Sequence, residues 1–359
     1  MKFYMPTRFY CERNCVSAHS AELSALGSNA LIVTGRRSSK LNGSLDDVLS
    51  ALSAHGVPGT VFDEAEENPS VETVMRAAAI GREAGADLVI GVGGGSALDA
   101  AKAVALMLAN PGKTGDFLYE SVPARHLPVA AVPTTCGTGS EVTGVSVLTR
   151  HDLKTKVSAK HLIFPDLALA DGKYLFSASR SIIVNTAVDA LSHLIESVVN
   201  LRSDRLSEMN AFEGLRLWAE CREYIEGAEL DAEGAEKLMA ASSLAGVSIA
   251  QTGTTLPHAL SYMLTYRAGV PHGPAVGAFE ANYLRLADKA LSGAVLSAAG
   301  FKDCDELDAF IRRLAPIKVS RELLELSAES VLAKPEKLAL CPFEVGKAEM
   351  ERLIKISDI

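Results

Sequence analysis

One carboxylate and three imidazoles are spaced so that they could share a metal ion. Asp189 and His193 are four residues apart in a segment with a helical pattern, so both lie on one helix face. His258 follows a proline that suits a first helical turn, and His272 lies in a turn framed by glycine and proline. This donor set suits a borderline divalent cation such as Fe²⁺ or Zn²⁺, a Lewis acid toward a substrate oxygen. The alternative to a metal site is that Asp189 and His193 are a surface or capped pair on one helix, and that the other two histidines are buried in a core.

A glycine-rich turn, residues 91–96, follows a strand-like run and opens a helix. Glycines let a phosphate approach the backbone closely, and a helix N-terminus offers N–H groups with positive potential. Gly94, Gly95 and Ser96 are therefore candidates for binding a diphosphate. The turn departs from the usual dinucleotide fingerprint, because Ser96 stands where the third glycine would be, and no P-loop lysine follows. Its alternative is a structural strand-to-helix turn.

A second polar loop, residues 133–143, follows the next strand-like run. Thr134, Thr135, Thr138 and Ser140 carry hydroxyls that can bind phosphate and ribose where open α/β sheets hold their ligands. Two such loops at neighbouring strand ends favour a nucleotide site over a surface loop rich in serine and threonine.

The turn after the strand-like run 30–34 indicates which nucleotide would bind. Folds that prefer NAD place an acidic residue at a strand end to bind the adenosine ribose. Here no carboxylate is present, and the turn consists of Gly35, Arg36, Arg37, Ser38, Ser39 and Lys40. Three cations and two hydroxyls suit a 2′-phosphate, which favours NADP(H) over NAD(H). A solvated basic turn is the alternative.

Strands and helices must position these candidates. Apolar runs at 30–34, 59–63, 86–92 and 128–132 alternate with helical patterns that start at 44, 71 and 97, which predicts a parallel sheet covered on both faces. Later segments read mainly as helices: 181–200, 203–225, 232–251, 256–266, 275–292 and 304–314. We therefore predict an α/β plus all-α protein, with a Rossmann-like nucleotide-binding domain at residues 1–180 and a helical metal-binding domain at residues 181–359.

The amino-acid composition restricts the classes of binding partner and the cellular location that we expect. The 359 residues carry 35 Lys+Arg against 44 Asp+Glu, a net charge of −9, so nucleic acid and anionic membranes are unfavourable partners. Without a secretory-type apolar stretch near the N-terminus or a run long enough to span a bilayer, we expect a cytoplasmic protein. The six cysteines are scattered, which indicates reduced thiols. Cys11 and Cys15 lack a second Cys/His pair at zinc-finger spacing, so we interpret them as unpaired thiols near a strand end.

Taken together, these motifs resemble those of the iron-containing (group III) alcohol dehydrogenases, and the similarity covers most of the chain. The matching blocks are residues 91–102, 133–143 and 189–193, with His258 and the segment 271–273. The segments 35–47 and 66–70 further resemble members that use NADP(H). The resemblance implies a dehydroquinate-synthase-like fold and reversible hydride transfer between NADP(H) and a small primary alcohol or aldehyde. It also implies a homodimer, since dimers are common among relatives.

The resemblance also assigns roles to residues. It implies that Asp189, His193, His258 and His272 hold a catalytic Fe²⁺, or Zn²⁺ in its place. The cofactor contacts that it implies are Gly95, Ser96, Asp99, Thr134, Thr135 and Thr138, together with Asn68, Lys156 and Leu175.

Two positions depart from the family pattern. Tyr262 stands where many members have a second histidine that is sometimes credited with proton relay, and Cys136 stands where many have alanine. A phenol can pass a proton or simply fill the space. Two other activities on the same fold remain open, a glycerol-dehydrogenase type and a maleylacetate-reductase type. A nucleotide-binding protein without catalysis is the third alternative.

Overall fold

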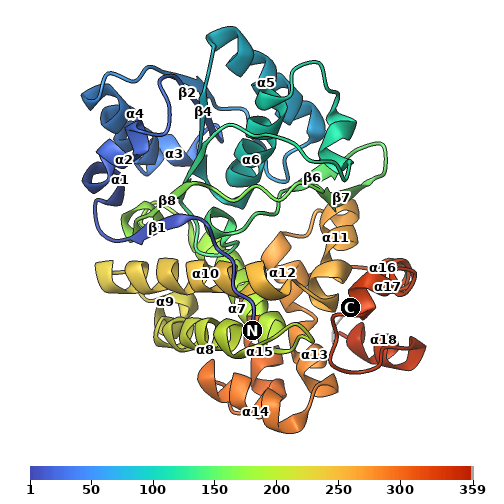
Figure 1. Ribbon diagram of the computed structural model, residues 1–359. Helices are drawn as coiled ribbons and strands as arrows, with labels where there is room; N and C mark the ends of the chain where they lie inside the picture. Colours follow the sequence, from blue (N-terminus) through green and yellow to red (C-terminus); the bar gives the residue numbers. More distant parts are fainter. Residues whose placement is uncertain (357–359) are drawn as a thin grey trace. The chain divides into compact units, whose positions relative to one another are not determined.

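The computed structural model describes residues 1–356, and the chain divides into two units (Figure 1). The sheet unit comprises Met5–Ser179 and Leu230–Met239. The helical unit comprises Met1–Tyr4, Arg180–Glu229 and the chain from Ala240 onward. The division near residue 180 follows the change from mixed to helical patterning in the sequence.

Six parallel strands form the centre of the sheet unit, in the order β1-β8-β5-β4-β2-β3. Their bounds are β1 Arg8–Cys11, β2 Ala30–Thr34, β3 Gly59–Phe62, β4 Leu88–Gly93, β5 Val129–Pro133 and β8 Leu167–Ala170. Strands β2, β4, β5 and β8 are buried throughout, as expected of parallel strands covered on both faces. The predicted parallel sheet is confirmed.

Alternate residues of the strands enter two hydrophobic cores, one on each face of the sheet. Leu31 and Val33 of β2 pack in one core, whereas Ala30 and Ile32 pack in the other, because successive side chains of a strand point to opposite faces. Helices α5 (Val71–Ala84) and α6 (Gly95–Ala109) cover the first face, where they pack against each other (Figure 1). The second core receives residues from helices α1 (Cys15–Ala18), α2 (Ser20–Ser24) and α4 (Ser44–Ala54).

Several short elements of this unit have no counterpart in the sequence-based prediction. Strands β1 and β8 pair at one edge of the sheet, and β6 (Val147–Arg150) pairs with β7 (Thr155–Ser158) as a separate antiparallel hairpin. Helix α3 is Ser38–Leu41, and the 3₁₀ helices are η1 (Gly115–Tyr119), η2 (Ser140–Val142) and η3 (Gly172–Leu175).

The helical unit has the following helices among its described residues: α7 Arg180–Val198, α8 Arg205–Glu220, α9 Arg222–Glu226, α10 Ala232–Thr252 (its first residues belong to the sheet unit), α11 Leu256–Ala268, α12 His272–Gly277, α13 Glu280–Leu286, α14 Lys289–Ala298, α15 Cys304–Leu314, α16 Arg321–Leu332, α17 Pro335–Leu338 and α18 Lys347–Leu353. The expectation of one helix over 275–292 is wrong. Three short helices cover this region, and the last begins where the Asp288 carboxylate accepts hydrogen bonds from the N–H groups of Ala290 and Leu291.

None of the helices in the described part of the chain combines the length and the apolar character needed to cross a bilayer. All six cysteines are free thiols, and Cys11 is the last residue of β1.

Candidate functional site

The predicted metal ligands come from three helices of the helical unit. Asp189 and His193 lie one turn apart on α7, His258 lies in the first turn of α11 after Pro257, and His272 is the first residue of α12. All except His272 are buried, and the side chain of His272 keeps 26% of its surface exposed. The site is therefore enclosed, with its accessible side at His272.

Asp189, His258 and His272 converge, with one donor atom from each within 4.8 Å of the others. The Oδ1 atom of Asp189 lies 3.6 Å from Nε2 of His258 and 3.7 Å from Nε2 of His272. The His193 ring stacks on the His258 ring, with 4.4 Å between centroids, so it lies beside this group of three. A fourth ligand at His193 stays a prediction.

The donor set fits a cation, because two buried acceptors face each other. The Nδ1–H of His258 donates a hydrogen bond to Oε1 of Glu196, so Nε2 is the ring atom that can bind a cation once its own proton is lost. That Nε2 atom and the Oδ1 of Asp189 are buried without a hydrogen-bond partner among residues 1–356. Two such acceptors 3.6 Å apart cost free energy unless a proton or a metal ion lies between them. Carboxylate and imidazole donors suit Fe²⁺ and Zn²⁺.

Charge interactions within the site shift the pKa values of Asp189 and His258. Burial alone would raise the pKa of Asp189, but the neighbouring His193 and His272 lower it well below its usual range. Burial would lower the pKa of His258, yet the charges of Glu196 and Asp189 raise it to about 9. Without a metal ion, His258 is thus protonated at neutral pH and balances the carboxylates. A divalent cation replaces that proton.

Glu196 is a residue that the sequence-based reasoning missed. It is fully buried, and its Oε2 atom accepts hydrogen bonds from the backbone N–H and, at 2.7 Å, the hydroxyl of Thr255. The signal was available, since Glu196 follows Asp189 by seven residues and therefore shares its helix face. Glu196 fixes the tautomer and orientation of His258.

A second buried carboxyl, Glu280 of α13, lies close to Glu196. Burial and then the negative charge of Glu196 raise the pKa of Glu280 well above its usual value. Burial and the nearby Glu196 charge therefore both favour the neutral form of the Glu280 carboxyl. No motif in the sequence linked Glu280 to the site.

Close packing of α12 against α7 places His272. A Cβ atom at Gly273 would lie 1.8 Å from the backbone oxygen of Asn185, so this position requires glycine. Ser261 of α11 lies 3.5 Å from Nδ1 of His272. Tyr262 stacks beside the His272 ring, with 6.2 Å between centroids, so the predicted relay residue is near the accessible side of the site.

The sheet unit brings the two predicted nucleotide loops together. They follow β4 and β5, which are neighbours in the sheet. A Cβ atom at Gly95 would lie 2.6 Å from Cγ2 of Thr138, and one at Gly94 would lie 3.1 Å from Oγ1 of Thr135. The glycines are thus needed for the polar loop to pack on the start of α6.

Two predicted contacts that are far apart in the sequence meet at the same turn. The backbone N–H of Asn68 donates to the Ser96 hydroxyl at 3.1 Å, and its side-chain oxygen accepts from Nζ of Lys156 at 3.1 Å. Asn68 has a positive φ of 56°, which asparagine tolerates better than most residues. Asn68, Ser96 and Lys156 therefore form one polar group beside the glycine turn.

Asp99 and Ser140 fix the polar loop to α6. The Ser140 hydroxyl donates to Asp99 at 2.6 Å, and the other Asp99 oxygen accepts from the backbone N–H of Val147 at 2.8 Å. Buried Lys102 donates to Ser140 at 2.7 Å and to the Val145 carbonyl at 3.0 Å. Like Glu196 and Glu280, Lys102 had no predicted role, although it lies in the block that contains the glycine-rich turn.

The remaining predicted contacts differ in accessibility. Thr134, Cys136 and Leu175 are buried. In the basic turn, which begins at Gly35, Arg36 and Ser38 are exposed. The Ser39 hydroxyl is buried and shares a 2.7 Å hydrogen bond with Thr34, while Lys40 pairs with Asp63 at 2.5 Å.

Comparison with known proteins gives matches along both units. Residues 6–172 match the family model described as iron-containing alcohol dehydrogenase, and residues 183–354 match the C-terminal model of the Fe-containing alcohol dehydrogenase family. A solved iron-containing alcohol dehydrogenase from Thermotoga maritima is 36% identical, with a TM-score of 0.90 and 98% of each chain covered.

Two curated relatives are similar over a shorter region. The long-chain primary alcohol dehydrogenase of Thermoanaerobacter ethanolicus is 34% identical over 70% of this chain. The sulfoacetaldehyde reductase of Bilophila wadsworthia is 32% identical, also over 70% of this chain. The matched regions span 64% and 65% of these two enzymes, just under two thirds of their length.

Proposed function

The chain belongs to the iron-containing alcohol dehydrogenase family, and we propose that it interconverts a small primary alcohol and its aldehyde with NADP(H). Oxidation moves a hydride from the alcohol carbon to NADP⁺ and releases the hydroxyl proton, and reduction consumes both. We assign the metal ion to Asp189, His193, His258 and His272, with Fe²⁺ as the family's ion. A divalent cation held there supplies Lewis acidity to the substrate oxygen.

One observation supports this proposal above the others, the buried pair of acceptors on Asp189 and His258. Glu196 keeps the proton of His258 on Nδ1, so Nε2 stays available as a donor atom. Burial of Asp189 and His258 excludes water and strengthens each charge interaction in the site. Tyr262 lies beside His272, where its phenol can donate a proton during reduction or accept one during oxidation.

We assign the nucleotide to the loops after β4 and β5, with the 2′-phosphate at the basic turn. Arg36, Arg37 and Ser38 are exposed there, whereas the Lys40 charge is partly offset by Asp63. If Arg36 binds the phosphate, Arg36→Ala should lower kcat/KM for NADPH by about 10–100-fold, the value of a charge-assisted hydrogen bond, and change that for NADH less than twofold.

Arg125→Ala is a matched control, because Arg125 is an exposed arginine that precedes β5. It therefore lies at the N-terminal end of the parallel strands, whereas the candidate nucleotide loops lie at their C-terminal end. Equal kcat/KM for NADPH and NADH in the unaltered protein, or equal losses in both variants, would contradict the NADP assignment.

The activity is tested by initial rates of NADPH and NADH oxidation with small aldehydes, using protein purified without oxygen and reconstituted with Fe²⁺. We expect NADPH turnover that chelation removes and Fe²⁺ restores. Sulfoacetaldehyde belongs in the panel, because one relative carries that activity in its name. Turnover confined to a polyol with Zn²⁺, or to a dicarboxylate, would favour the other activities of this fold. Nucleotide binding without metal binding would indicate a protein without catalysis. We further propose a homodimer, which light scattering tests.

A further inference from the structure

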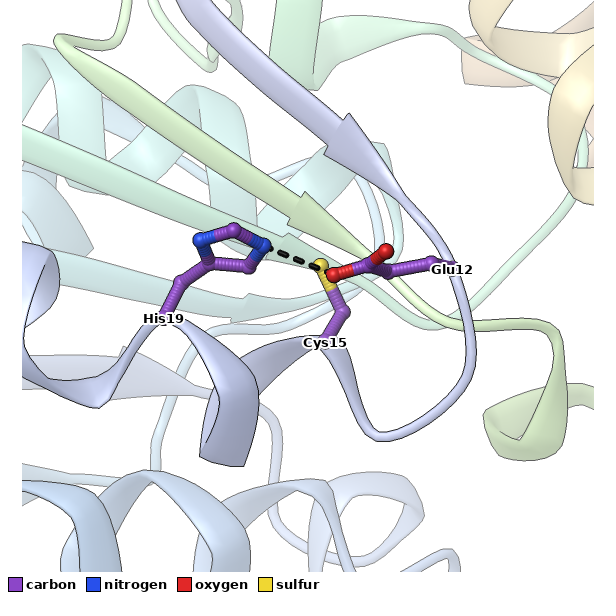
Figure 2. Close-up of side chains that lie close together, drawn as sticks. All are labelled: Glu12, Cys15 and His19. Carbon is purple, nitrogen blue, oxygen red and sulfur yellow. Dashed lines mark hydrogen bonds and ion pairs between the residues drawn. The ribbon is translucent and has the colours of Figure 1, made fainter.

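Three potential metal ligands converge at the start of the sheet unit, apart from the Asp189 site. Glu12 directly follows β1, Cys15 begins α1, and His19 lies between α1 and α2. One donor atom from each lies within 4.8 Å of the others, and Figure 2 shows the three side chains pointing toward one another. Cys15 joins this group, whereas the exposed thiol of Cys11 does not.

The His19 ring is held in place from three sides. Its Nε2 atom lies 2.8 Å from Oε1 of Glu12, and its Nδ1 atom lies 2.5 Å from Oε2 of Glu22 (Figure 2 shows the first contact). The Tyr10 ring stacks on it, with 3.6 Å between centroids and 19° between planes. A carboxylate on Nδ1 is the arrangement that orients a metal-binding histidine and leaves Nε2 to the ion.

The Cys15 thiol completes a donor set of three kinds. Its side chain is fully buried and makes a long 3.6 Å contact with the carbonyl oxygen of Tyr10. Thiolate, imidazole and carboxylate are the donors that Zn²⁺ uses in proteins, whereas Mg²⁺ and Ca²⁺ avoid sulfur. The three residues follow one another at intervals of three and four, so one short segment of the chain supplies all the donors.

We propose that Glu12, Cys15 and His19 form a second cation site, which takes a thiophilic divalent ion of the zinc class. Three protein donors leave the fourth tetrahedral position to water. Donor atoms in such a site are about 3.5 Å apart, so Oε1 of Glu12, which lies 2.8 Å from Nε2 of His19, must move away from that nitrogen to make room for the ion. The Glu12 side chain is 53% exposed and can rotate to make this movement. The bound ion would tie the end of β1 to α1 and α2.

Without an ion, the same geometry is a set of direct contacts between the His19 ring and the carboxylates of Glu12 and Glu22. The metal-bound and metal-free states differ in the role of Cys15, because its sulfur is a ligand only when an ion is bound. A thiolate bound to Co²⁺ gives a charge-transfer absorption in the near ultraviolet, which an ion pair cannot produce. Co²⁺ is therefore the probe that we choose.

The test uses the full chain with His258→Ala, which removes the first site, stripped by a chelator and titrated with Co²⁺ without oxygen. We expect the thiolate band to saturate at about one equivalent. Cys15→Ser in the same background should abolish the band, and Cys11→Ser, which changes the neighbouring exposed thiol, should retain it. A missing band in His258→Ala, or a band that survives Cys15→Ser, overturns the proposal.

A second variant covers the case in which Cys15→Ser fails to fold. His19→Phe keeps an aromatic ring against Tyr10 and leaves the buried thiol in place, but it removes both ring nitrogens. We expect at least tenfold weaker Co²⁺ binding in a chelator competition, with an unchanged far-ultraviolet circular dichroism spectrum. Equal affinity in His19→Phe and its parent overturns the site.

Discussion

Exchanging Glu196 for glutamine tests how the metal centre is oriented. The carboxylate accepts three hydrogen bonds, from Nδ1 of His258, from the N–H of Thr255 and from its hydroxyl. An amide of the same shape has only one oxygen. If that oxygen stays with the two Thr255 donors, the NH₂ group faces Nδ1 of His258 and forces the ring proton onto Nε2. That proton then occupies the position between His258 and Asp189.

The size of the effect follows from this loss of a prepared donor atom. Removing the carboxylate partner of a metal-binding histidine typically costs 10–100-fold in metal affinity. This corresponds to about 1.4–2.7 kcal/mol of binding free energy. We therefore expect Glu196→Gln to bind Co²⁺ at the Asp189 site at least tenfold more weakly than the unaltered protein does.

The assay is a chelator-competition titration with Co²⁺, in the Cys15→Ser background so that the second cation site does not contribute. Thr255→Ser is the matched control, because it keeps a hydroxyl and a backbone N–H toward Glu196. NADPH binding and circular dichroism verify that each variant is folded. Equal Co²⁺ affinity in Glu196→Gln and its parent, with both folded, would refute the role given to Glu196.

Two further predictions concern the same centre. Gly273→Ala should destabilise the protein by about 1–3 kcal/mol and weaken metal binding, because its Cβ would lie 1.8 Å from the Asn185 oxygen and displace the neighbouring His272. The control is Gly293→Ala, on an exposed helix face with nothing within 4 Å, which should not destabilise the protein. Equal melting temperatures for the two variants would count against this packing. The pKa of His258 is raised to about 9, so a cation must displace its proton at neutral pH. Co²⁺ affinity of the stripped protein should therefore rise about tenfold per pH unit from pH 6.5 to 8 and level off above pH 9. An affinity that is constant over this range would show that no proton is displaced.

The parts of the fold that the sequence predicted share a strong local signal. Buried parallel strands such as β2 and β4 are continuous apolar runs, and α5 begins at Val71, directly after Ser70, whose side chain caps the helix. Strand β1 gave a weaker signal, because its sequence begins with an arginine and is not a continuous apolar run. The hairpin of β6 and β7 was missed because its strands are short and mix apolar with polar residues.

The residues of the site likewise divide into those that a local sequence pattern relates and those that only the fold brings together. Helical spacing relates Asp189 and His193, and it would also have identified Glu196 on the same face. By contrast, Asn68 and Lys156 are 88 residues apart, and only the folded sheet unit brings them together. Glu280 likewise reaches Glu196 from another helix, so no spacing rule could relate the two. Tertiary packing, not pattern, determines these contacts.

The central claim is that metal binding by His258 and its partners is required for turnover, while the nucleotide binds to the separate sheet unit. The most direct measurement compares NADPH binding and aldehyde reduction in the unaltered protein and in His258→Ala, both reconstituted with Fe²⁺ without oxygen. We predict that His258→Ala loses turnover while its Kd for NADPH stays within about twofold. Turnover that survives the substitution, or loss of NADPH binding together with turnover, would contradict the claim.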